Sequence, residues 1–227
     1  MKKKLSVILS VLMITLLVGG TMAYAGEADD AVYTVGICQL VQHNALDAAT
    51  KGFRDALVEA LGEDHVIFDE QNAAGDTATA TTICTNLVSE NVDLILANAT
   101  PALQSAAAAT NEIPILGTSI TEYGVALEID NFDGTVGGNI SGTSDLAPLD
   151  QQAEMVKELF PDVKTVGILY CSGEANSIFQ YNVISELLKE MGYEDVRLTD
   201  TTDGTFLGRR EAVLLGLGGS MLLTGRK

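Results

Sequence analysis

Apolar residues follow two alternating spacings along this chain. Short runs that are apolar throughout are separated by stretches in which apolar residues fall three or four positions apart, as on one face of a helix. The strands expected in the first half are Tyr33–Leu40, His65–Asp69, Leu94–Ala97 and Ile115–Ser119, with helices starting near Ala45, Asp76 and Pro101. Buried strands that alternate with helices predict an α/β fold, in which helices cover both faces of a parallel sheet.

This pattern is interrupted between residues 128 and 148, where glycines and polar residues dominate. We interpret this segment as a crossing between two lobes, because the alternation then resumes. The second half is expected to contain helices at Leu149–Phe160 and Asn176–Met191 and strands at Thr165–Tyr170 and Asp195–Thr199. The prediction is a bilobal chain, with a first lobe at residues 30–145 and a second at 146–204.

The last residues do not continue the pattern. From residue 205 the chain reads TFLGRREAVLLGLGGSMLLTGRK, which has apolar clusters but neither strand nor helix periodicity. A short edge strand with a frayed tail is one explanation. We favour the alternative that the native reading frame is lost near Asp203, so that residues 205–227 are aberrant or disordered. The second lobe is then incomplete, because two strands and two helices cannot bury both faces of a sheet.

The N-terminus has the order typical of a secretory signal peptide. Three lysines precede the apolar run Leu5–Val18, and Ala23-Tyr24-Ala25 supplies a site for cleavage after Ala25. A membrane span would need about 20 apolar residues, which is longer than this run. Residues 1–25 are therefore predicted to be removed, and the protein is expected to be secreted, in the periplasm or at the outer face of the cytoplasmic membrane.

Charge and composition exclude several classes of function. The chain has 31 acidic and 13 basic residues, a formal net charge of −18, which repels the phosphates of nucleic acids. With only two histidines and no closely spaced Cys or His pair, neither a metal site nor a cofactor is expected. Cys38, Cys84 and Cys171 leave two options open, one disulfide with a free thiol or three buried thiols.

Polar residues gather where the predicted strands end, which is where parallel sheets bind ligands. The candidates are Gln39 and His43 after the first strand, Thr100 and Ala102 after the third, Thr118 in the fourth, Ser144 and Asp145 in the crossing, and Glu174, Asn176 and Ser177 in the second lobe. Helix N-termini and hydroxyl groups favour a carboxylate, and Asp145 or Glu174 would hold an ammonium group. Together they suit an amino acid clamped between lobes. Thr100 and Asp145 also fit a simpler role as helix caps.

An enzyme is the competing hypothesis. Cys38 and His43 suggest the nucleophile and base of a secreted α/β hydrolase-like enzyme. Their spacing across a strand end rarely aligns such a pair, and a cysteine buried in a strand is usually inert. We therefore expect no enzymatic activity.

Three segments carry a resemblance to a known family. YTVGICQLVQHNALDAATKGFRDAL, ILANATPALQSAAAAT and GGNISGTSDLAPLDQQAEMVKELFPDVKTVGILYCSGEANS resemble ABC-transporter substrate-binding proteins of the tryptophan/tyrosine type, over about residues 33–202. The resemblance implies the bilobal periplasmic-binding-protein fold, which closes on a small ligand, often an aromatic amino acid, and delivers it to an ABC permease in the membrane. We expect the protein to be a monomer. The resemblance matches all the candidates above except Thr118. Family members continue with a motif resembling PTDNT and return to the first lobe. This chain has neither, which supports a truncated second lobe.

Overall fold

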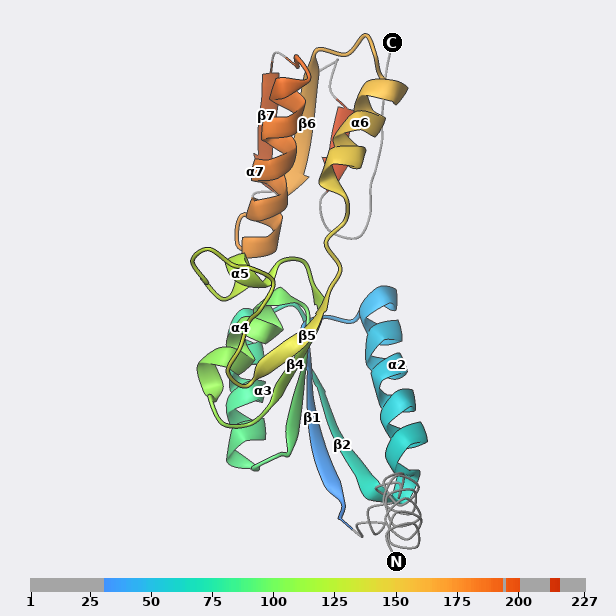
Figure 1. Cartoon of the computed structure of the whole chain (residues 1–227), viewed down its shortest axis with the longest axis vertical. Helices are drawn as coiled ribbons and strands as arrows, with labels where there is room; N and C mark the ends of the chain where they lie inside the picture. Colours follow the sequence, from blue (N-terminus) through green and yellow to red (C-terminus); the bar gives the residue numbers. More distant parts are fainter. Residues whose placement is uncertain (1–30, 194, 201–212, 217–227) are drawn as a thin grey trace, which may run out of the picture. The chain divides into compact units, whose positions relative to one another are not determined.

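A computed structural model describes residues 31–193, 195–200 and 213–216, the last two segments by their backbone (Figure 1). These residues form two parallel β-sheets with flanking helices, and each sheet is described by itself. The predicted signal peptide lies outside the described residues. None of the helices within the described part is long and apolar enough to cross a membrane.

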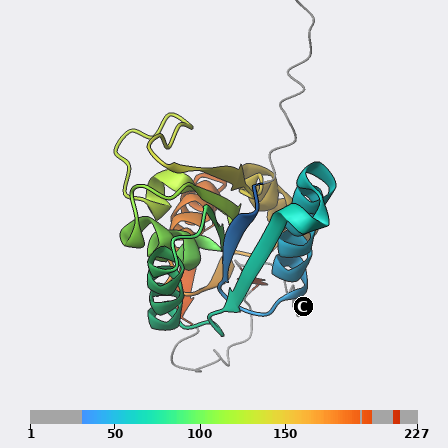
Figure 2. The same cartoon turned by 90° about the horizontal axis from the view of Figure 1, so that it is seen from below.

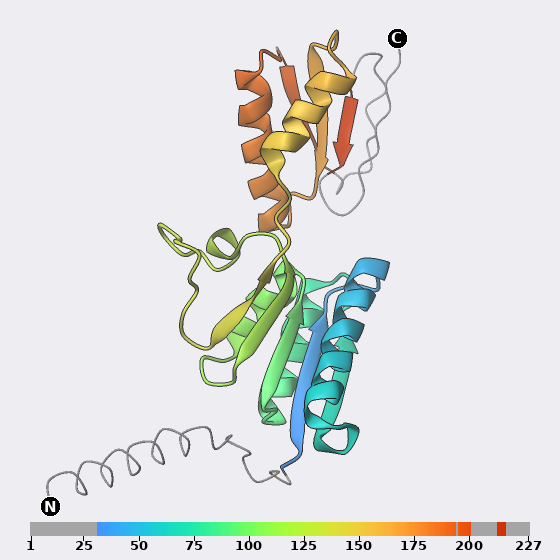
Figure 3. The same cartoon turned by 45° about the vertical axis from the view of Figure 1, so that its right-hand side comes forward.

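The first sheet has five strands in the order β2-β1-β3-β4-β5, all parallel (Figure 3). Its strands are β1 Tyr33–Gln39, β2 Val66–Asn72, β3 Leu94–Asn98, β4 Ile115–Ile120 and β5 Ile140–Ser144; its helices are α2 Asn44–Leu61, α3 Thr77–Ser89, α4 Thr100–Ala109 and α5 Tyr123–Ala126, with the 3₁₀ turn η2 Glu63–His65. The predicted α/β class is confirmed. The strand order reverses between β1 and β3, and doubly wound sheets bind ligands outside the carboxyl ends of strands at such a point.

Helices cover both faces of this sheet (Figure 2). On one face, Phe53 and Leu57 of α2 pack on a buried cluster that contains Ile37 of β1. On the other face, α3 and α4 pack on a larger cluster that contains Cys38 of β1 and Ile95 of β3. Successive residues of a strand point to opposite faces, so Ile37 and Cys38 enter different cores.

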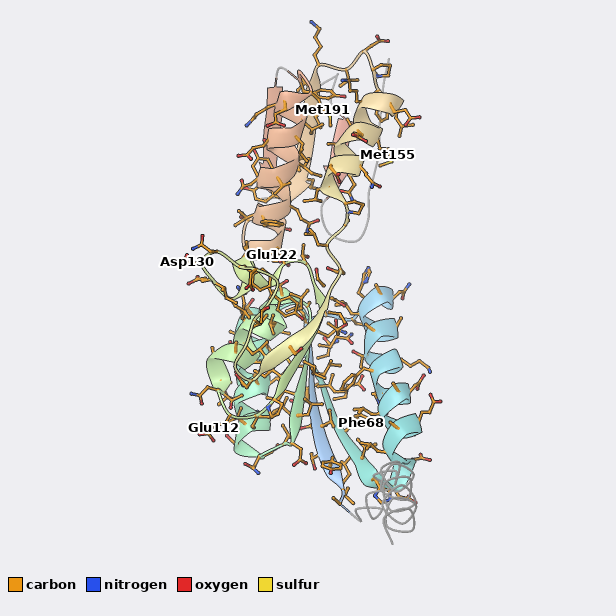
Figure 4. All side chains as sticks on the ribbon, in the orientation of Figure 1. Phe68, Glu112, Glu122, Asp130, Met155 and Met191 are labelled. Carbon is orange, nitrogen blue, oxygen red and sulfur yellow. The ribbon has the colours of Figure 1, made fainter. Side chains whose placement is uncertain are left out.

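On the face of the sheet that α2 covers, the helix also contacts the edge strand β2. Phe68, labelled in Figure 4, lies under the Arg54 guanidinium, which is 4.9 Å from the centre of the ring. Arg54 Nη1 also donates to Glu70 Oε2 over 2.8 Å. The side chain of Arg54 therefore ties α2 to the outer strand of the sheet.

The interpretation of residues 128–148 as an irregular crossing is wrong for the part that forms β5. Ile140–Ser144 pairs in parallel with β4, although most of its side chains are exposed and it has no apolar run. Its position depends on Gly142, where a Cβ atom would lie 2.2 Å from the Gly117 carbonyl oxygen. A glycine allows this close backbone approach, and it gives the strand no apolar periodicity to detect.

The second sheet has three described strands in the order β7-β6-β8. They are β6 Thr165–Tyr170, β7 Asp195–Asp200 and β8 Val213–Gly216, accompanied by α6 Leu149–Leu159 and α7 Ala175–Glu190. Both helices pack on Val166 and Ile168, which share one face of β6. Residues 213–216 lie in the tail that we expected to be aberrant or disordered, and they pair in parallel with β6, as in the alternative of a short edge strand. The rest of the tail lies outside the described residues.

Candidate functional site

The carboxyl ends of β1 and β3 lie side by side at the switch point of the first sheet. Gln39 and Asn98, the last residues of these strands, are register partners, and Leu40 N donates to Asn98 O over 3.1 Å. The chain leaves β1 toward α2 and leaves β3 toward α4. Two helix N-termini therefore start at this edge of the sheet, α2 after His43 and α4 at Thr100.

A buried polar network holds α2 on these strand ends. Asn98 Nδ2 donates to Leu46 O and to Thr50 Oγ1, each over 2.9 Å. Thr50 Oγ1 donates to Gln39 Oε1 over 2.7 Å, and Gln39 Nε2 donates to Asp47 Oδ1 over 2.6 Å. Gln39, Thr50 and Asn98 are at most 4% exposed. The side chain of Gln39, predicted as a ligand contact, is thus engaged in positioning α2.

The α4 N-terminus has unused hydrogen-bonding capacity. Thr100 Oγ1 and Asn98 Oδ1 are both buried, and neither has a hydrogen-bond partner among the described residues. First-turn N–H groups have no partner within their helix, and the helix dipole makes this end attractive to anions. Thr100 does not act as the cap, because the N-cap is Ala99 and no side-chain bond caps the helix. Ala102, also predicted, is fully buried in the same turn.

Two strained residues lie at this edge. Ala99 has φ +89° and ψ +156°, a region that non-glycine residues rarely occupy, and Ser119 in β4 has φ +57°. Ala99 N donates to Thr118 O over 3.0 Å, so the strained segments are neighbours. Thr118, a predicted contact, is half-buried beside them. Strain of this kind is retained where the surroundings fix it, often at ligand sites.

The end of β5 brings a carboxylate to the same sheet edge. Asp145 is exposed, and its backbone N donates to Ile120 O over 2.9 Å. It does not cap α6, whose N-cap is Pro148. Ser144 Oγ is occupied, because it donates to Thr121 O over 2.8 Å. Burial and the nearby charge of Asp145 raise the pKa of Tyr123 to about 12, so its hydroxyl stays neutral and donates to Gly117 O.

The geometry contradicts a Cys–His catalytic pair. Cys38 is fully buried in the α3 core, where its Sγ lies 3.9 Å from Ala80 O. The hydrogen bond with the Cys84 thiol, together with burial, raises the pKa of Cys38, so it is a neutral thiol at neutral pH. His43 is exposed and caps α2, its Nδ1 accepting from Ala45 N over 3.2 Å. An activated thiolate cannot form in this arrangement.

The remaining predicted residues lie at the N-terminus of α7, a helix that packs on the second sheet. Glu174 is the N-cap and makes no side-chain capping bond, while Ser177 is 2% exposed. Asn176 Oδ1 is buried without a partner in the described structure. Nearby, the rings of Tyr170 and Tyr181 stack with centroids 5.2 Å apart. This helix start thus also presents unused polar atoms.

A separate groove of about 760 Å³ opens between α2 and β2. Its lining includes Asp47, Arg54 and Glu70, charged side chains that already bind one another or the network above. Thr100 Oγ1 lies at the N-terminus of α4 instead, and the amide of Asn98 belongs to the network with α2. No group of three or more metal-ligating side chains occurs in the described part of the chain.

Comparison with known proteins identifies the family. The sequence profile described as "ABC transporter substrate binding protein" matches residues 34–201. The chain belongs to the family of ABC transporter substrate-binding proteins. A relative, the "Tyrosine-binding protein" of Clostridioides difficile (strain R20291), is 40% identical over 164 residues, which are 71% of this chain and 47% of that protein. This substrate-binding protein thus spans about half the length of that relative.

Solved structures of substrate-binding proteins agree with this family assignment. The ABC domain in complex with L-Trp from Streptococcus pneumonia has a TM-score of 0.70 and 35% identity, covering 75% of this chain and 58% of that one. The ligand-free, open structure of a substrate binding protein with adhesive properties from Clostridium difficile has a TM-score of 0.58 and 36% identity, with the same coverage of 75% and 58%. A leucine binding protein from Thermotoga maritima shares the fold, with a TM-score of 0.60 at 16% identity, covering 77% of this chain and 50% of that one. These matches are to solute-binding proteins and give no support to the hydrolase hypothesis.

Proposed function

We propose that this chain is the extracytoplasmic solute-binding component of an ABC importer, and that it binds an amino acid at the carboxyl ends of β1, β3 and β4. The observation that carries the proposal is the pair of buried, unpartnered oxygens at Asn98 and Thr100, beside the N-terminus of α4. The sequences of relatives described as binding tyrosine and L-Trp make an aromatic amino acid the preferred ligand.

Each part of an amino acid has a complementary group at this edge. The first-turn N–H groups of α4 and the Thr100 hydroxyl would bind the α-carboxylate. The exposed carboxylate of Asp145 would attract the ammonium group. Glu174, Asn176 and Ser177 at the start of α7 are proposed to complete the site from the second lobe. His43, exposed at the start of α2, is proposed to contact the ligand's side chain.

The proposed mechanism is closure of two lobes on the ligand, followed by delivery to a membrane permease. Secretion by the N-terminal signal sequence would bring the protein to the compartment in which that permease opens. The binding protein is proposed to act as a monomer and to need no cofactor or metal.

The test is a thermal melt of the chain with each of the amino acids, L-tryptophan and L-tyrosine first. A ligand that binds only the folded state raises stability by about 2.7 kcal/mol at a hundredfold excess over its Kd, so one or a few amino acids should raise Tm. Thr100→Val should weaken binding about tenfold or more, because a hydrogen bond to a charged group is lost.

Ser105→Ala is the matched control. Ser105 is a buried hydroxyl of the same helix, and its Oγ donates to Pro101 O over 2.9 Å within α4. This variant should bind as the parent does. A cooperative melt that no amino acid shifts would refute the proposal for this chain, and equal affinity of both variants would refute the role of Thr100.

A further inference from the structure

Two of the three thiols lie together in the core of the first sheet. Cys38 is near the end of β1 and Cys84 is on the inner face of α3, and both are 0% exposed. Each thiol shifts the pKa of the other, upward for Cys38 and downward for Cys84, so the two side chains are within range of one another. The third thiol, Cys171, is partly exposed after β6 in the other sheet.

A contact with the backbone of α3 shows where the sulfur of Cys38 lies along that helix. Cys38 Sγ lies 3.9 Å from the carbonyl oxygen of Ala80, four residues before Cys84 in α3. In an α-helix that carbonyl accepts the N–H of Cys84, and the two residues stack on one face. The sulfur of Cys38 is thus directly beside the turn that carries Cys84. Cys84 Sγ, in turn, lies 4.0 Å from Ala102 O in the first turn of α4.

We propose that Cys38 and Cys84 are joined by a disulfide bond when the protein folds in an oxidising compartment. The bond would tie β1 to α3 directly beneath Gln39 and the α4 N-terminus. It would thereby fix the floor of the candidate site. The inference goes beyond the ligand proposal, since it depends on neither the ligand nor the second lobe.

The oxidant is a second disulfide, either a small-molecule disulfide or that of a thiol–disulfide oxidoreductase. The thiolate of one cysteine attacks it, giving a mixed disulfide and one released thiol, and the other cysteine then displaces the second thiol. The two protons lost from Cys38 and Cys84 end on the two released thiols, and the oxidant takes the two electrons. Because both sulfurs are buried in the folded core, the exchange takes place before β1 and α3 close.

The test compares the full chain refolded in oxidised and reduced glutathione with the chain refolded in dithiothreitol. Each sample is quenched in acid, denatured, alkylated with N-ethylmaleimide and weighed by mass spectrometry. The oxidised sample should carry one maleimide, on Cys171, and proteolytic mapping should recover Cys38 linked to Cys84. The reduced sample should carry three. The oxidised form should melt roughly 10 °C higher, because the bond restricts the unfolded chain.

Cys171→Ser is the control, since it removes the thiol outside this core. Its oxidised form should carry no maleimide and the same linkage. Three maleimides after oxidative refolding, a glutathione adduct on Cys38 or Cys84, or a bond to Cys171 would each overturn the proposal. None of these results bears on amino-acid binding, so the two proposals fail separately.

Discussion

The approach of β5 to β4 yields a quantitative prediction for Gly142→Ala. A Cβ atom at position 142 would lie 2.2 Å from Gly117 O, 2.2 Å from Tyr123 Oη and 2.7 Å from Gly117 N. Ordinary carbon contacts are about 3.5–4.0 Å, so β5 must retreat by more than about 1 Å. Such a shift breaks neighbouring ladder hydrogen bonds, each contributing about 1 kcal/mol. We expect a total loss of about 3–4 kcal/mol, including about 1 kcal/mol for the backbone conformation.

Gly137→Ala is the matched control, because it also places an alanine at a positive φ but brings the new Cβ atom into no clash. Gly137 has φ +76°, and a Cβ there would meet nothing within 4 Å. It should therefore lose only about 1 kcal/mol. Urea unfolding, followed by far-UV circular dichroism, measures the free energy of unfolding of both alanine variants. The comparison requires that the variants have the same denaturant dependence, the m value. Adding Tyr123→Phe to Gly142→Ala should recover part of the loss, because one of the colliding atoms is removed. Equal stability of the two alanine variants would refute the close approach of β5.

Three further predictions concern the same sheet edge. Ala99→Gly should raise the free energy of unfolding by about 1 kcal/mol in chemical denaturation, because glycine relieves the positive φ; a loss would show that no strain is stored there. Thr50→Val should lower it by about 1–3 kcal/mol, since Gln39 and Asn98 lose a buried partner; an unchanged midpoint would contradict the network. The pKa of Tyr123, raised from 10.0 to about 12, favours the neutral hydroxyl in the folded state. The contribution of Tyr123 to the free energy of unfolding should therefore be complete below pH 10 and should be lost as the pH rises from 10 to about 12. The Tyr123→Phe variant should not show this loss. If the free energy of unfolding of the variant and of the parent changed identically with pH, the role of Tyr123 would be refuted.

Most of the first sheet was predictable because its inner strands contain short apolar runs, such as Leu94–Ala97 in β3. A strand with apolar residues on both faces needs helices on both faces of the sheet, so the alternation of such runs with helical spacings predicts the layers. β5 was missed because its position depends on one glycine fitting against Gly117, a contact that leaves no period in the sequence. β8 was not the favoured interpretation of the tail, since three apolar residues followed by glycine do not distinguish a strand from a helix.

The positions of the candidate residues at strand ends were predictable, but the hydrogen bonds that they make were not. Strand ends mark where ligands bind, so Thr100 and Asp145 could be named from their positions alone. The roles of Gln39 and Asn98 depend on Thr50, which is 11 and 48 residues away from them. Thr50 lies on the buried side of α2, where a polar residue is the one sign of such a network. Long-range partners of this kind become visible only in the folded chain.

The two outer strands of the first sheet differ from the inner ones in a way that affects how molecules of this protein meet. β2 carries the polar run Asp69-Glu70-Gln71, and β5 is mostly serine, glycine and threonine with exposed side chains. An edge strand offers free backbone groups to which another chain can add, and charged or poorly β-forming residues discourage that addition. The apolar strands that would aggregate most readily, β1 and β3, are enclosed between neighbours. The strand order thus protects the first sheet against edge-to-edge self-association at high protein concentration.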